Sequence, residues 1–125
     1  MGMFSDFKQS LSESSGRILW SQLADTQQKM ARLPEHIRTA ALMGFLTKRD
    51  KLIDALDNMT GDGRIALGKE LQSKARSTFD MNLAEGYALW LTGAWLESMD
   101  RPGLEAARTH EFLDQVARES GGRWA

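Results

Sequence analysis

The chain of 125 residues contains no cysteine, only two prolines and a single tyrosine. Without cysteine it cannot form disulfides, thiol-based catalytic sites or thiolate metal sites, and this composition is typical of a reducing compartment. Sixteen Lys and Arg stand against seventeen Asp and Glu, which gives a net charge of −1. We therefore expect no long-range attraction to nucleic acid or to an anionic membrane, although local charged patches are compatible with this balance.

Long apolar runs are also missing. The most apolar segment lies between Glu85 and Glu97, and these two charges enclose only eleven residues, whereas a helix that crosses a bilayer needs about 20. The first residues have neither a basic region nor a continuous apolar region of the kind found in a secretory signal peptide. These absences predict a cytoplasmic protein without a membrane span.

The length of the chain indicates one domain. A chain of this size has the most common domain length and buries about two thirds of its unfolded surface. No repeat, low-complexity block or linker divides it. We expect a single domain over residues 1–125, with loose ends at residues 1–3 and 121–125.

The densest apolar segment, residues 83–97, has the spacing of a central helix. Its apolar residues fall on two nearly opposite faces, so the helix needs cover on both sides. Gly86 and Gly93 lie on the same side as Trp90, and each costs roughly 0.8–1 kcal/mol relative to Ala inside a helix. We expect them either to let another helix approach closely or to make room for the indole ring. The two faces are formed by Leu83, Tyr87, Trp90, Leu91, Ala94 and Trp95, and by Leu89, Leu96 and Met99.

The rest of the chain also has helical spacing, and no segment alternates as a strand would. Proline and glycine mark the expected connections. We favour a bend near residues 79–82, because an unbroken helix from Arg64 to Met99 would be about 54 Å long at 1.5 Å per residue. The prediction is an all-α domain, a compact bundle of five or six helices with short connections. The helices are expected in residues 3–33 with a break near Ser14–Gly16, from Pro34 to about Met59, from Arg64 to about Thr78, from Leu83 to Met99, and from Leu104 to the glycines at 121–122.

One connection is comparable to a calcium-binding loop. With a glycine placed at the sixth loop position, Asn58, Thr60 and Asp62 fall at the first, third and fifth positions. The twelfth position, which should carry a bidentate carboxylate, holds Lys69, and Glu70 comes one residue late. We therefore favour a plain connection between two helices over a calcium site.

Residues 64–76 allow a second interpretation, as the recognition helix of a DNA-binding helix-turn-helix. Their cations and amides spread over more than one helix face, and the nearly neutral chain supplies little attraction to phosphates. Nucleic-acid binding is kept as a minor alternative, and a solvated helix surface is favoured.

Two further groups invite a site. His110 and Asp114 form an i, i+4 pair that can bind a metal if other ligands join it. Without a Glu-x-x-His or His-Glu-x-x-His spacing, we favour a surface histidine beside a carboxylate and expect no metal or cofactor. Arg49 falls on an apolar stripe, where an arginine usually lays its stem on apolar surface and directs its head to water or to a carboxylate. We favour that role over ligand binding.

Large apolar side chains outnumber recognisable chemistry, with four Trp, five Phe and seven Met. The leading hypothesis is therefore a non-enzymatic protein that acts through protein–protein interaction, as a homodimer or as an adaptor or regulator. The alternative is a sensor or carrier that holds an apolar small molecule between helices near Tyr87, Trp90 and Trp95. Exposure of the rings separates core residues from interface residues. The interface candidates are Phe4, Phe7, Trp90, Trp95 and Trp124.

Overall fold

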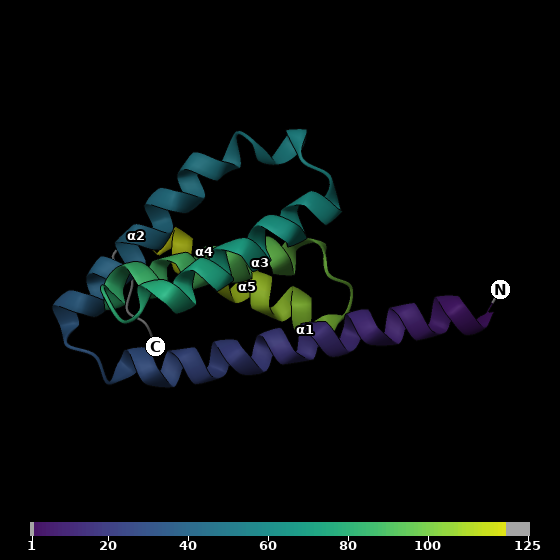
Figure 1. Ribbon diagram of the computed structural model, residues 1–125, viewed down its shortest axis with the longest axis horizontal. Helices are drawn as coiled ribbons and strands as arrows, with labels where there is room; N and C mark the ends of the chain where they lie inside the picture. The colour runs from purple at the N-terminus through teal and green to yellow at the C-terminus, as the bar shows by residue number, and fades with distance from the viewer. Residues whose placement is uncertain (1, 120–125) are drawn as a thin grey trace.

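The computed structural model describes the backbone of residues 2–119 and the side chains of residues 15–119. This part of the chain contains helices and no strand (Figure 1), so the predicted all-α bundle with short connections is confirmed. None of the helices described has the length and the apolar character needed to cross a membrane. The elements are α1 (Gly2–Ala31), α2 (Glu35–Ile53), the short 3-10 helix η1 (Leu56–Asn58), α3 (Gly61–Thr78), α4 (Leu83–Asp100) and α5 (Leu104–Arg118).

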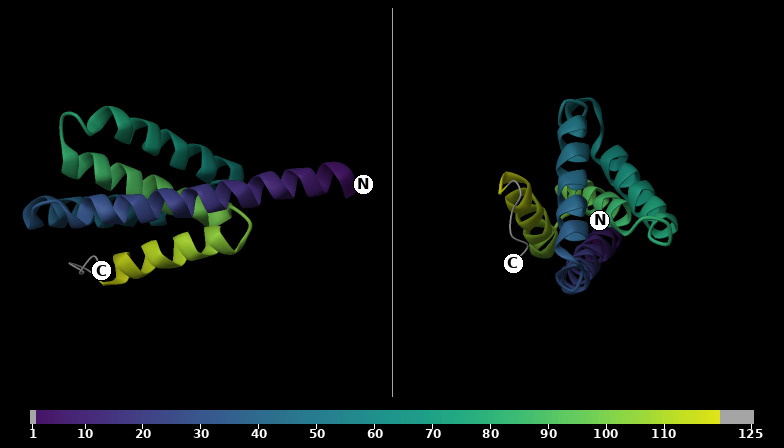
Figure 2. Two further views of the ribbon diagram at one scale, coloured as in Figure 1. Left: turned by 90° about the horizontal axis from the view of Figure 1, so that it is seen from below. Right: turned by 90° about the vertical axis from the view of Figure 1, so that its left-hand side faces the viewer.

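Helix α4 lies at the centre of the bundle. Helices α1, α2, α3 and α5 all contact it, and Figures 1 and 2 show them arranged around it. From Gly86 to Ser98 every residue of α4 except Trp90 is buried. Because buried positions occur all the way round this helix, its cover comes from several sides. This agrees with the two apolar faces of residues 83–97.

Two glycines allow α3 and α4 to cross in close contact. A Cβ atom on Gly93 would lie 2.5 Å from the carbonyl oxygen of Gly68, and one on Gly68 would lie 2.6 Å from the carbonyl oxygen of Gly93. Gly93 therefore permits the close approach of another helix. Gly86 makes room for a ring, but the ring belongs to Phe79, which would lie 2.6 Å from a Cβ atom there. That ring also meets Tyr87 edge-on, with centroids 4.8 Å apart.

Side chains cap the N-termini of α3 and α4. The hydroxyl of Thr60 accepts a hydrogen bond from the backbone N–H of Gly63 at 3.0 Å. The side-chain oxygen of Asn82 accepts one from the N–H of Glu85 at 3.1 Å. Each bond satisfies a donor that the first turn of a helix leaves unpaired. The predicted break between the two helices, at residues 79–82, is confirmed.

Two predicted boundaries are wrong. The break expected near residues 14–16 does not occur, because α1 continues without interruption. Gly16 lies inside the helix and faces α5, where a Cβ atom would lie 3.2 Å from the Cβ of Ala106. The small residue thus serves a helix contact and not a turn. The helix expected to reach Met59 ends instead at Ile53.

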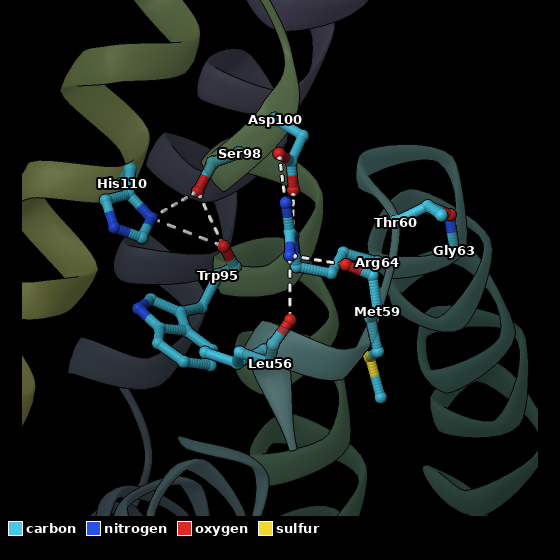
Figure 3. A network of polar contacts seen from close by, with 9 residues as sticks. All are labelled: Leu56, Met59, Thr60, Gly63, Arg64, Trp95, Ser98, Asp100 and His110. Carbon is cyan, nitrogen blue, oxygen red and sulfur yellow. Dashed lines mark hydrogen bonds and ion pairs between the residues drawn. The ribbon is translucent and has the colours of Figure 1, made fainter. Parts of the chain in front are cut away.

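Arg64 explains the early end of α2. Its Nη1 donates to the carbonyl oxygens of Leu56 and Met59 at 2.8 and 2.9 Å (Figure 3). Its Nε and Nη2 donate to the two carboxylate oxygens of Asp100, the last residue of α4, at 2.5 and 2.9 Å. The hydrogen bonds from Arg64 lower the pKa of Asp100 and raise that of Arg64 from their ordinary values. One guanidinium therefore holds the α2–α3 connection in a turned conformation against α4.

The two halves of α1 have different surroundings. Its second half packs along α5 and α4, and the ring of Trp20 lies under the guanidinium of Arg108, 5.0 Å from ring centroid to Cζ. Figures 1 and 2 show that the first half continues past the ends of the other helices. Residues 2 and 3 belong to this helix, while residues 1 and 120–125, which include the predicted loose C-terminal end, lie outside the described residues.

Candidate functional site

Trp95 lies in the core, in a polar cluster that joins α2, α4 and α5. Its side chain is 3% exposed. The guanidinium of Arg49 lies over its ring, 5.3 Å from the centroid, and the ring of His110 stacks at 6.0 Å. Arg49 Nη2 donates to Asp114 Oδ1 at 2.9 Å. The head of Arg49 therefore lies on a carboxylate, one of the two positions expected for it.

His110 and Asp114 point to different partners. His110 Nδ1 lies 3.2 Å from Ser98 Oγ and 3.4 Å from the carbonyl oxygen of Trp95 (Figure 3). Asp114 is paired with Arg49 from another helix. Within the described residues no group of three or more His, Asp or Glu is arranged to hold a metal ion. The pair contributes to contacts between helices, and two buried N–H groups of the cluster, Arg49 Nε and Trp95 Nε1, have no partner in this part of the chain.

Tyr87 and Trp90 line a cleft of about 410 Å³ together with Phe79 and Leu83, opposite polar side chains of α1. Trp95 belongs to the same core but does not line this cleft. Tyr87 is buried, and Trp90 is half-buried at this cleft. We call this the aromatic cleft.

A second cleft, of about 320 Å³, lies between α1 and α3 above the end of α4. Its floor holds a nearly buried ion pair, in which Nε and Nη2 of Arg101 donate to Glu97 Oε1. The Arg101 and Glu97 side chains are 10% and 7% exposed. The wall formed by α3 carries Lys69, Gln72 and Arg76. We call this the basic cleft.

Sequence reasoning missed the basic cleft. One face of α3 carries Lys69, Gln72 and Arg76, because residues three and four apart lie on the same side of a helix. This spacing is visible in the sequence and predicts the polar face. Assigning these three residues to a solvated surface overlooked α1 on the other side of the cleft. Gln72 is in fact buried, with 8% of its surface exposed.

A third hollow, of about 270 Å³, lies between α2 and α3. It is lined mainly by leucines, among them Leu52, Leu67 and Leu71, with Lys48 and Lys51 beside them. Lys48 is already paired with Glu85 of α4 at 2.8 Å. Its other polar lining groups are Lys51, which is exposed, and Thr92, whose hydroxyl donates to the carbonyl oxygen of Ala88.

The loop compared with a calcium site has another structure. Thr60 caps α3 with its hydroxyl, Asn58 belongs to η1, and Asp62 and Glu70 lie on α3. The glycine that was placed sixth in the loop, Gly63, therefore lies in the first turn of a helix. The four candidate ligands do not surround one point.

Residues 64–76, the possible recognition helix, lie within α3. Each nitrogen of the Arg64 guanidinium donates a hydrogen bond within the chain, and Gln72 is buried. Neither side chain is presented on the free surface of this helix.

The remaining interface candidates fall where side chains are not described. Phe4 and Phe7 belong to the first half of α1, whose backbone alone is described, and Trp124 lies outside the described residues altogether. Phe4 and Phe7 both belong to the first turns of α1, and this end of the helix extends past the bundle (Figure 1).

No relative assigns a role to these clefts and surfaces. No family model matches the chain, and no curated protein or solved structure is similar to it.

Proposed function

We propose that this is a non-enzymatic helical protein that acts by binding another protein, in the first instance a second copy of itself. The observation that supports this is the course of α1, whose first half continues past the helices that cover its second half (Figures 1 and 2). In that half Phe4, Phe7 and Leu11 follow at spacings of three and four residues. Such spacing places apolar residues on one helix face.

The first half of α1 is long enough that covering its apolar face with a partner would stabilise it. Residues 2–14 would span about 20 Å at 1.5 Å per residue. Isolated helices shorter than about 12–15 residues are marginal in water, and most helices in proteins are stabilised by packing an apolar face. Two copies that pair through this segment supply such cover to each other. If the protein acts as an adaptor or regulator, a different protein binds the same apolar face of α1.

Sedimentation of the full chain tests the proposal. We expect a dimer in the micromolar range, and Phe7→Glu should shift the chain toward monomer because it places a charge on the apolar face. Gln9→Glu is the matched control, since it adds the same charge on the opposite side of the same helix and should leave association unchanged. A strict monomer across this range, or equal effects of the two substitutions, contradicts self-association through α1.

Cytoplasmic location belongs to the same proposal. It is supported by the absence of cysteine, which suits a reducing compartment. Cell fractionation tests it.

A second function, the binding of an apolar small molecule, is favoured by the aromatic cleft. Its volume of about 410 Å³ falls within the roughly 300–1,000 Å³ of ordinary ligand sites. Trp90, half-buried at this cleft, should change its fluorescence emission when an apolar compound binds, and Trp90→Phe should remove that change. Emission that stays constant with compounds of increasing apolar length argues against this function.

A further inference from the structure

The basic cleft carries more positive charge than its surroundings. Lys69, Arg76 and Arg101 line it against one carboxylate, that of Glu97, so three cations and one anion leave a local charge of +2. The whole chain has a net charge of −1. The excess does not come from the ion pair on the floor, which is neutral, and so it belongs to Lys69 and Arg76.

These two cations have no partner in the part of the chain whose side chains are described. Neither Lys69 nor Arg76 takes part in an ion pair there. Both are exposed on the face of α3 that borders the cleft. Among the described side chains, Lys51 and Lys74 are also exposed helix cations without an ion pair, so Lys69 and Arg76 are distinguished by their position beside the cleft.

Gln72 lies between the two cations and is the second, independent indication of a ligand. Its side chain is more than nine-tenths buried and lines the cleft. Its Nε2 has no hydrogen-bond partner among the described residues. A buried amide N–H without an acceptor is unfavourable by about 1–3 kcal/mol. Nε2 is covered in the structure, so an anion in the cleft would accept its hydrogen bond once the side chain turns toward the cleft.

The neighbouring aromatic cleft adds an apolar part to the site. Gln22 of α1 and Arg76 of α3 line both clefts, so the two are adjacent. The charges lining the aromatic cleft balance, with Lys29 and Arg76 against Asp25 and Asp80. Because Arg76 lines both clefts, the joint lining has four cations against three carboxylates. A charged group is therefore favoured in the basic cleft, which has only Ile18 and Leu19 as apolar lining, and the aromatic surface lies beside it.

We infer that the two clefts together bind an organic anion. Its carboxylate or phosphate group lies in the basic cleft and accepts hydrogen bonds from Lys69, Gln72 and Arg76. Its apolar part lies over Phe79 and Trp90. The apolar half of this inference rests on the second proposed function, whereas the anionic half stands on the basic cleft alone.

Calorimetric titration of the full chain at constant ionic strength tests the inference with four probes: octanoate, octyl phosphate, octanol and inorganic phosphate. We expect octanoate or octyl phosphate to bind at least tenfold more tightly than octanol or inorganic phosphate. Which of the two octyl anions binds more tightly identifies the head group. Octanol that binds as tightly as octanoate overturns the anion site but leaves an apolar ligand in place. Binding by none of the four probes overturns both the inference and the second proposed function.

Substitutions on α3 locate the anion. Loss of one hydrogen bond to a charged group weakens binding by about tenfold, which is the effect expected for Arg76→Gln and for Gln72→Leu. Arg76 is exposed, so its variant remains informative if the buried leucine disturbs folding. Lys74→Gln removes the same charge from the opposite side of the helix and should change binding less than twofold. Equal weakening by Arg76→Gln and Lys74→Gln would show general charge attraction and overturn the site.

Discussion

The crossing of α3 and α4 provides the sharpest test of the fold, through the substitution Gly93→Ala. The added methyl group would lie 2.5 Å from the carbonyl oxygen of Gly68, whereas ordinary contacts begin at 3.4 Å. The two helices would have to separate by the difference, 0.9 Å, because the obstacle is backbone and cannot rotate away. Overpacking of this kind costs about 1–3 kcal/mol, and the better helix propensity of Ala offsets roughly 0.8–1 kcal/mol of it.

We therefore expect Gly93→Ala to lower the free energy of unfolding by about 1 kcal/mol, the midpoint of the first range less the propensity gain. For a chain of this size that corresponds to a fall of about 3–5 °C in Tm. Urea unfolding followed by circular dichroism measures the change. Ala66→Gly, on the exposed face of α3, calibrates the propensity term and should cost about 1 kcal/mol. If Gly93→Ala equals or exceeds the parent chain in stability, the close crossing of the two helices is refuted.

Two further predictions concern charged groups. Glu97→Gln leaves Arg101 without its counter-charge in a nearly buried position. We expect the free energy of unfolding, measured in urea, to fall by at most about 3 kcal/mol, and most of this loss to be restored when Arg101→Met and Glu97→Leu are combined. No recovery in the double variant would contradict this. The pKa of Asp100 is lowered by the hydrogen bonds from Arg64, so its contribution to stability is complete above the ordinary aspartate pKa of about 3.9 and is lost as the pH falls through the lower folded value. Asp100→Asn should flatten the acid side of the stability curve, measured by urea unfolding at a series of acid pH values, and an unchanged acid slope would refute this coupling.

The connections marked by proline and the break before α4 could be predicted because they depend on local sterics and local hydrogen bonds. The end of α2 was predicted too late, since Arg64 holds the connection that follows it against Asp100 of α4. Pro34 and Pro102 cannot continue a helix but fit its first turn, and α2 and α5 begin just after them. Asn82 caps α4, so the break before it needs no information from other helices. The apolar spacing of residues 83–97 likewise predicted a helix with cover on two sides.

Contacts between distant segments could not be predicted in this way. Gly16 resembles a turn residue in sequence, and only the position of Ala106 on α5 explains why it lies inside a helix. The helical spacing of apolar residues in α4 predicts that Tyr87 and Trp95 lie on one broad face, but it does not predict which helices pack against that face. In the structure one ring borders a cleft with α1 and the other is covered by Arg49 of α2.

The candidate site was harder to find than the fold for the same reason. The face that carries Lys69, Gln72 and Arg76 is visible in the sequence, yet a helix face becomes a binding wall only when another element stands opposite. That element is α1, which packs along α5 through contacts such as that between Trp20 and Arg108. The net charge of the chain, −1, did not predict a basic cleft, because the local charge of +2 is hidden in that total.

The burial of α4 changes where an interface should be sought. Trp95 was a partner candidate because a helix apolar on two sides needs cover, and in the fold its own chain provides that cover. A partner that inserted there would have to displace Arg49 together with its bond to Asp114. Among the described helices, the first half of α1 extends past the ends of the others (Figure 2), and in the sequence its apolar spacing continues through Phe4 and Phe7. A surface contact through α1 leaves the core intact, so it requires far less rearrangement than one through the tryptophan of the central helix.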